Sequence, residues 1–195
     1  MFAQEEIDDH VAATWKVARD ILEEGHTVGL ATFIFCTEDP LTGDPGRGIV
    51  PGVETGQLDE RNALLAVWRA IAIAGKASHV ILVQDTWMVK VPKVEGQGFP
   101  GLGCAPSEHP DREESLLITI EHADGARNER LPYVRDQGRI IFGEMEITEL
   151  KHEQRKGRLR IMGVGEPPAV VKMAARNLAK LTLRREEPIK PQASV

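Results

Sequence analysis

The chain has 195 residues, of which 42% are apolar, so it suits one domain with a sizeable core, alone or with an appendage. No run approaches the roughly 18 consecutive apolar residues of a membrane span. The acidic segment Met1–Asp9 lacks the basic-then-apolar order of a secretory signal. Cys36 and Cys104 stand in dissimilar contexts, which argues against a disulfide framework and a zinc site. We therefore expect a cytoplasmic protein that enters no membrane and holds no cofactor.

The net charge of −6 conceals a strong asymmetry along the chain. Residues 1–150 contain 13 Lys/Arg and 26 Asp/Glu, a net charge of −13. Residues 151–195 contain 11 Lys/Arg and 4 Asp/Glu, a net charge of +7. Such a split is typical of a basic appendage that meets an acidic partner. The sequence therefore predicts an acidic α+β domain over 1–150 and a basic C-terminal appendage over 151–195.

Two segments have the periodicity of amphipathic helices. The first ends at Gly25 and repeats apolar residues every three or four positions: Ile7, Val11, Trp15, Ala18 and Leu22. The second runs from Asp59, whose carboxylate suits an N-cap, to Ala74, just before a helix-ending glycine. Its apolar residues share one face: Leu64, Leu65, Trp68, Ile71 and Ala72. We expect both helices to pack on a sheet.

The segment Thr27–Cys36 is apolar on both alternating sets of a strand. A strand of this kind is usually central and covered on both sides. Helices account for one cover, and a subunit interface is the natural candidate for the other. The sequence thus predicts a homo-oligomer.

The longest strand pattern is Ser78–Val91, in which Asp85 shares a face with apolar residues that include Trp87. Burying an unpaired charge is costly, so Asp85 needs an explanation. A β-bulge could turn it outward, a buried arginine could pair with it, or it could be a functional carboxylate. The same pattern predicts that Trp68 and Trp87 are buried where the second helix meets this strand.

Two long loops are the candidate site of an enzyme or small-ligand binder: residues 37–56 and 92–112. The residues with suitable chemistry at or near the second loop are Asp85, His109, Asp111 and Glu114. His109, Asp111 and Glu113 can also bind metal, but such sites need further ligands from elsewhere in the chain. We expect no metal site.

Asp85-Thr86-Trp87 on a strand is followed by the segment Pro106-Ser107-Glu108-His109-Pro110-Asp111-Arg112-Glu113. This combination resembles a pattern in uncharacterised small proteins of bacteria and their phages. The resemblance covers about residues 78–145 and implies no activity. It favours a phage or mobile-element source, and so a bacterial cytosol or a phage-infected cell.

Three further strands are predicted, at 114–122, at 130–134 and at 139–147. Pro132 lacks a ladder donor, which favours an edge position for the second of them. The turns between them are short and rich in glycine and aspartate, so the three strands read as an antiparallel meander.

A C-terminal helix is predicted over 169–185. Its apolar stripe consists of Val171, Ala174, Leu178 and Leu181, and its basic stripe of Lys172, Arg176, Lys180 and Arg184. The basic stripe is either the solvated face of a docked helix or a surface that meets phosphates, a partner's acidic surface or this protein's own acidic body. An acidic protein surface suits it better than nucleic acid, because the acidic body repels phosphate.

These patterns predict an α+β fold: an antiparallel sheet of about five strands, two packed helices and a basic C-terminal helix. The function that they favour is a non-catalytic interaction protein, such as a phage or mobile-element accessory, regulatory or structural component. It would act through an oligomer or partner surface. The alternative is the enzyme or small-ligand binder with its site between the two long loops.

Overall fold

A computed structural model describes residues 2–53, 58–89, 104–151, 161–162 and 168–183. The helices are α1 (Gln4–Glu23), α2 (Leu58–Ala74), the short 3-10 helix η1 (Pro106–Glu108) and α3 (Ala169–Leu183). The strands are β1 (Ala31–Glu38), β2 (Pro45–Val53), β3 (Ala77–Val89), β4 (Arg112–His122), β5 (Gly125–Asp136), β6 (Arg139–Phe142) and β7 (Glu146–Lys151). The fold is α+β, as the sequence predicts.

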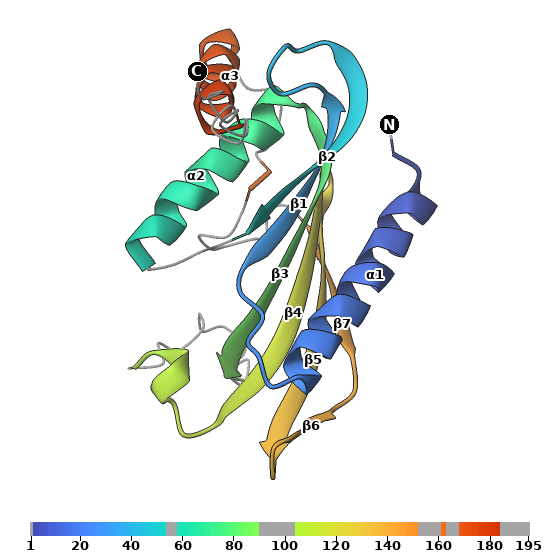
Figure 1. The fold of residues 1–195 in the computed structure, drawn as a ribbon, viewed down its shortest axis with the longest axis vertical. Helices are drawn as coiled ribbons and strands as arrows, with labels where there is room; N and C mark the ends of the chain where they lie inside the picture. The colour runs from blue at the N-terminus through green and yellow to red at the C-terminus, as the bar shows by residue number, and fades with distance from the viewer. Residues whose placement is uncertain (1, 54–57, 90–103, 152–160, 163–167, 184–195) are drawn as a thin grey trace, which may run out of the picture.

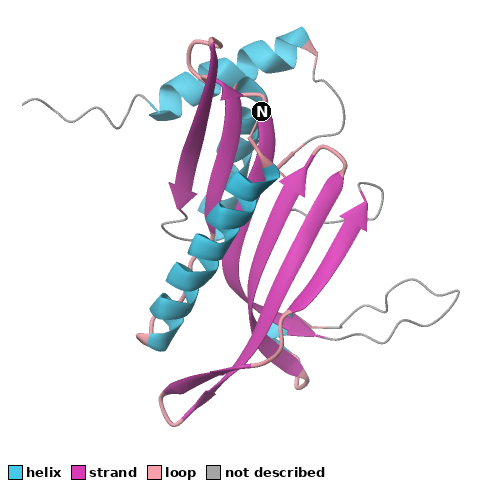
Figure 2. Ribbon diagram, turned by 90° about the vertical axis from the view of Figure 1, so that its right-hand side faces the viewer, coloured by secondary structure: helices cyan, strands magenta, loops and turns pink. Residues whose placement is uncertain are grey.

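The strands form one antiparallel sheet in the order β2-β1-β3-β4-β5-β6, and β7 also pairs with β5. The sheet therefore has seven strands rather than about five. α1 crosses one side of it, which we call the α1 face (Figure 1). α2 lies on the opposite side, the α2 face, with α3 packed against α2 (Figure 2). The two helix layers cover different parts of the sheet.

β2 occupies part of the segment that the sequence predicts to be a loop. Among the described strands it pairs with β1 alone, so it is an edge strand, where proline and glycine are tolerated. Gly52 has a packing reason: a Cβ at this position would overlap Nε1 of Trp68, which lies over it from α2. β2 is therefore rich in glycine and proline, and its sequence resembles that of a loop.

β5 is an internal strand, which corrects the expected short edge strand. It pairs with β4 along its length, while its other side pairs first with β7 and then with β6. Pro132 lies at the change from one neighbour to the other, so its missing N–H removes no ladder bond there. Its carbonyl oxygen instead accepts from the N–H of Gly143 at 2.7 Å.

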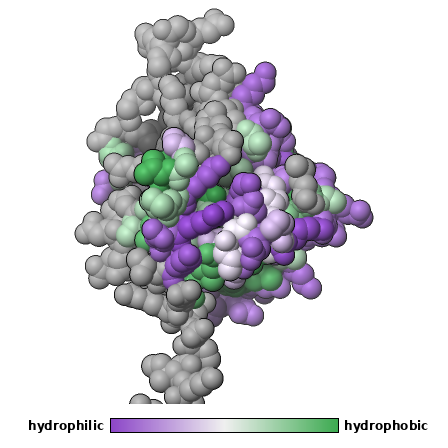
Figure 3. Space-filling view, turned by 90° about the horizontal axis from the view of Figure 1, so that it is seen from above, coloured by the Kyte–Doolittle hydropathy of each residue, from purple (hydrophilic) through white to green (hydrophobic). Residues whose placement is uncertain are grey.

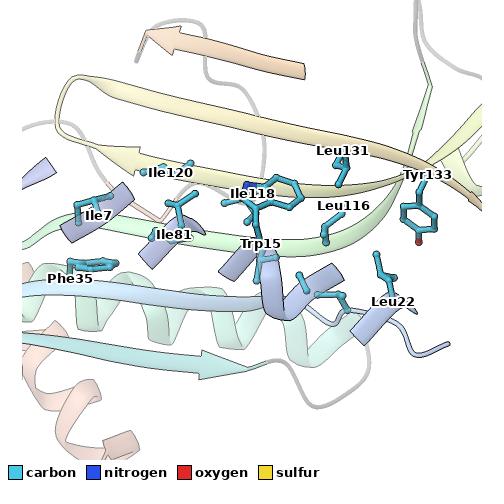
Figure 4. Packing of buried hydrophobic residues seen from close by; sticks show 14 residues of the cluster. Ile7, Trp15, Leu22, Phe35, Ile81, Leu116, Ile118, Ile120, Leu131 and Tyr133 are labelled. Atoms are coloured by element: carbon cyan, nitrogen blue, oxygen red, sulfur yellow. The ribbon is translucent and has the colours of Figure 1, made fainter. Parts of the chain in front are cut away.

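The core on the α1 face is built from large side chains. Ile7 and Leu22 of α1 are fully buried against β1, β3, β4 and β5 (Figure 4). Between them, Trp15 donates its indole N–H to Oε2 of Glu129 at 2.5 Å. Tyr133 closes this row of side chains at the end near Leu22 (Figure 4). The helical spacing seen in the sequence is the spacing of this buried row.

The core on the α2 face joins α2 and α3 to the sheet. Leu65, Trp68 and Ile71 of α2 are buried in it together with Ile34 of β1. Phe35, the neighbour of Ile34, is buried on the opposite face against α1. Both faces of β1 are therefore covered by helices of the same chain, and the apolar character of this strand does not require a subunit interface.

A buried carboxylate attaches the chain before α3 to the sheet. Glu121 is fully buried on the α2 face. Its Oε2 accepts the backbone N–H groups of Ile161, at 3.0 Å, and of Met162, at 2.7 Å. Two N–H donors partly replace the water that the carboxylate loses on burial. Ile161 in turn is buried in the core beneath α2 and α3.

Candidate functional site

Asp85 lies on the α1 face, beyond the apolar row of the core, in a hydrogen-bonded cluster. Its Oδ1 accepts from the hydroxyl of Tyr133 at 2.6 Å, and its Oδ2 is 3.9 Å from Nη2 of Arg135. Nε of Arg135 is 3.3 Å from Oε2 of Glu114. β3 pairs with β4 without a break from His79 to Val89, so no bulge turns Asp85 outward. The carboxylate is instead paired with an arginine and a tyrosine.

The electrostatics of this cluster favour a structural role over acid–base chemistry. Burial raises the pKa of the Tyr133 hydroxyl, and the adjacent Asp85 carboxylate raises it further. The hydrogen bond that Arg135 donates to the hydroxyl oxygen of Tyr133 raises the pKa of Arg135, and the neighbouring carboxylates raise it further. At neutral pH the hydroxyl thus remains protonated and the guanidinium charged. A general acid or base needs a pKa near the working pH, and neither group moves toward it.

His109 and Asp111 are not part of this cluster. They lie in the turn between η1 and β4, where Nδ1 of His109 accepts the backbone N–H of Asp111 at 3.1 Å. Of the four candidates, the structure brings together Asp85 and Glu114 and leaves the other two in a local turn. Within the described ranges, no three His, Cys, Asp or Glu side chains are arranged to hold a metal ion.

The two loops of the alternative site lie apart. In the register of the sheet, Cys36 of β1 pairs with Ala77, at the start of β3, so the turn 39–44 lies at that end. Arg112 pairs with Val89, at the far end of β3, so the turn 104–111 lies at the other end of the sheet (Figure 1). The described parts of the two loops therefore form no common site; residues 54–57 and 92–103 lie outside the described chain.

Trp87 is not buried against α2, which corrects the prediction that it packs with Trp68. It is 38% exposed and lies on the α1 face, whereas Trp68 lies on the α2 face. The guanidinium carbon of Arg112 is 5.0 Å from the centroid of the Trp87 ring. α2 covers the α2 face and cannot contact a side chain on the α1 face. Side chains alternate between the two faces along β3, and this alternation places Trp87 on the α1 face.

A hollow of about 490 Å³ adjoins Trp87 and Arg112, and we call it the Trp87 hollow. The aromatic rings in its lining also include Tyr133 and Phe142, whose centroids are 6.2 Å apart in an edge-to-face arrangement. Sequence reasoning missed Tyr133, Arg135 and Phe142, because only strand pairing brings them next to Asp85 and Trp87. A larger hollow, of about 670 Å³, contains the cross-strand neighbours His79 and His122.

The C-terminal helix forms as predicted, but its apolar stripe is not the docked face. α3 packs on α2 through small residues, Ala175 and Ala179, which are 6% and 0% exposed. Val171 and Leu178, of the predicted stripe, are 40% and 37% exposed. Alanine lets two helices approach closely, which explains why the small residues and not the large ones lie at the contact.

The basic stripe lies at the margin of the contact with α2. Lys172, Arg176 and Lys180 are half-buried. Nη2 of Arg176 is 3.4 Å from Oε2 of Glu38, so this cation already meets an acidic group of the same chain. The side chain of Leu181 and all of Arg184 lie outside the described part of the structure. Partner binding by these cations stays a prediction.

The remaining side of α3 exposes a continuous set of mainly apolar side chains, which we call the apolar arc. Val170 and Met173 are 66% and 61% exposed. The arc consists of Val170, Val171, Met173, Ala174 and Leu178. Seen from above, apolar side chains gather on the side of the molecule where α2 and α3 lie (Figure 3). Exposed apolar patches of this kind mark contact surfaces.

Comparisons with protein families, with characterised proteins and with solved structures find no match to this chain. In the described part of the chain, no helix combines the length and the apolar character needed to cross a membrane.

Proposed function

We propose that the protein is a non-catalytic interaction protein that associates with a second copy of itself through α3. The apolar arc carries this proposal, because a helix that docks through alanines and exposes valine, methionine and leucine gains by covering them. The interactions of the candidate catalytic groups also support a non-catalytic role. Asp85 and Glu114 are engaged with Tyr133 and Arg135.

The charge distribution favours a second copy as the partner. The net charge of −13 over residues 1–150 and of +7 over residues 151–195 makes the chain electrostatically complementary to itself. The pair formed by Arg176 of α3 and Glu38 of β1 is an instance of this attraction within one chain. Self-association of this kind is consistent with an accessory or structural component. The resemblance of residues 78–145 to phage and bacterial proteins supports the same role.

The test compares the oligomeric state of the full chain with that of variants in the apolar arc. We expect the wild-type protein to sediment as an oligomer at about 10–100 µM, the range of modest interfaces. Val170→Glu and Met173→Glu should shift it to the monomer, because each places a charge in the contact. Both side chains are exposed, so the melting temperature should barely change.

Val17→Glu is the matched control, since Val17 is an equally apolar, 58% exposed residue on α1. It should leave the oligomer intact. A monomeric wild-type protein across this range would sink the proposal. So would a loss of association that is as large for Val17→Glu as for the α3 variants, because the effect would then come from added charge alone.

A further inference from the structure

The Trp87 hollow has the composition of a small-molecule site. Its volume of about 490 Å³ lies within the roughly 300–1,000 Å³ of known ligand pockets. Apolar surface comes from the rings of Trp87 and Phe142, which lie on the same face of the sheet. A few charged groups converge on this surface, which is the usual arrangement of a pocket that orients its ligand.

The charged side chains that line the hollow differ in whether they form ion pairs. Glu113 forms an ion pair with the buried Arg130, and Glu114 forms one with Arg135. Arg135 also faces Asp85. Arg112 differs from all of them: among the described residues it has no carboxylate within ion-pair distance, and its contact is with the face of the Trp87 ring. Arg112 is therefore the cation of the lining that no described carboxylate neutralises, and its donors remain for a ligand.

The contact with Trp87 also orients Arg112. A guanidinium over an aromatic face is held by a cation–π interaction that leaves its in-plane N–H donors free. Those donors match the two oxygens of a carboxylate or a phosphate. An apolar ring in the hollow would cover the free parts of the aromatic side chains, while its anionic group reached Arg112.

We propose that the Trp87 hollow binds a small molecule that carries an anionic group, carboxylate or phosphate, on a flat apolar ring. Arg112 binds the anion, and the aromatic lining packs on the ring. Trp87 positions Arg112 and contributes to the ring contact. This site lies on the α1 face and is independent of the association through α3.

The experiment titrates the full-length protein with 1-naphthoate and 1-naphthyl phosphate, followed by saturation-transfer and protein-observed NMR. We expect saturable binding with a Kd of about 1 mM or tighter for at least one of them. The tighter ligand identifies the anionic group. 1-Naphthamide, which keeps the ring without the charge, and acetate, which keeps the charge without the ring, should each bind about tenfold more weakly or not at all.

Arg112→Gln should weaken the naphthyl anions about tenfold and make naphthoate equal to naphthamide, since only the charge is lost. Trp87→Leu should weaken all the naphthyl ligands. Arg139→Gln, on exposed β6 outside the lining, is the control and should change nothing. Absence of saturable binding up to about 10 mM, far above the expected Kd, would overturn the proposal. Equal binding of naphthoate and naphthamide by the wild type, or unchanged binding by Arg112→Gln, would overturn it as well.

Discussion

α1 and α3 are both amphipathic in sequence, yet they use their faces in opposite ways. α1 buries its large apolar residues, including Ile7, Trp15 and Leu22, against the sheet. α3 buries alanines against α2 and exposes its valines, Met173 and Leu178. A sheet offers a broad apolar surface that accepts large side chains, whereas a neighbouring helix can be approached closely only through small ones. Periodicity therefore identifies an amphipathic helix without identifying the face that docks.

The largest expected effect is on α1. Trp15→Ala should lower the free energy of unfolding by about 3–5 kcal/mol, as for buried aromatic residues in general. The loss includes the hydrogen bond from the indole to Glu129, whose carboxylate is also paired with Arg127 at 2.9 Å. Urea denaturation measures it. A loss under about 1 kcal/mol, the size of an ordinary surface effect, would show that α1 is not the main cover of the sheet.

The attachment of the chain before α3 comes next. Glu121→Ala should cost about 1.5–3 kcal/mol, the range for hydrogen bonds to a charged group, because it leaves the N–H groups of Ile161 and Met162 without their acceptor. Amide hydrogen exchange at these two residues should accelerate. If exchange there stays slow in the variant, Glu121 does not hold this segment.

The contact between α3 and α2 can be overfilled. Ala179 is 0% exposed, so Ala179→Leu should destabilise the protein by about 1–3 kcal/mol, the usual cost of overpacking. Ala174 lies on the exposed apolar arc, and Ala174→Leu should be neutral to within about 0.5 kcal/mol. Thermal unfolding of the pair distinguishes the two faces. The reverse order of effects would mean that the apolar arc is the docked face after all.

The smallest effect concerns Tyr133, at the end of the core under α1. The pKa of Tyr133 is raised in the folded state, so folding favours the protonated hydroxyl. The stabilisation that the protonated hydroxyl provides is therefore fully present below the unfolded-state pKa of about 10. That contribution is lost as pH rises above about 10 toward the higher folded-state pKa. Tyr133→Phe should cost about 1–2 kcal/mol at neutral pH, through the lost hydrogen bond to Asp85.

The loss of stability above about pH 10 should also be shallower in Tyr133→Phe than in the wild type, because one titrating group has been removed. Melting temperatures measured from pH 7 to 11 provide the comparison. Parallel pH profiles for the two proteins would contradict the assignment of this titration to Tyr133.

The local elements follow from patterns within short stretches of the sequence. The spacing of Ile7 to Leu22 and of Leu65 to Ile71 places both helices, and alternation places β1, β3 and β4, because these patterns reflect geometry within a few residues. The C-terminal helix was predicted for the same reason. The α+β class follows from the order of these elements along the chain.

The pairing of strands and the contacts between distant segments are visible only in the folded structure. β2 is a strand because it pairs with β1 and because Trp68 lies over Gly52, a contact that no local pattern contains. Asp85 is explained by Tyr133 and Arg135, which come from a strand about fifty residues later in the chain. The docked face of α3 depends on the shape of α2. Pairing partners and close approach arise between distant segments, so the sequence of one segment does not specify them.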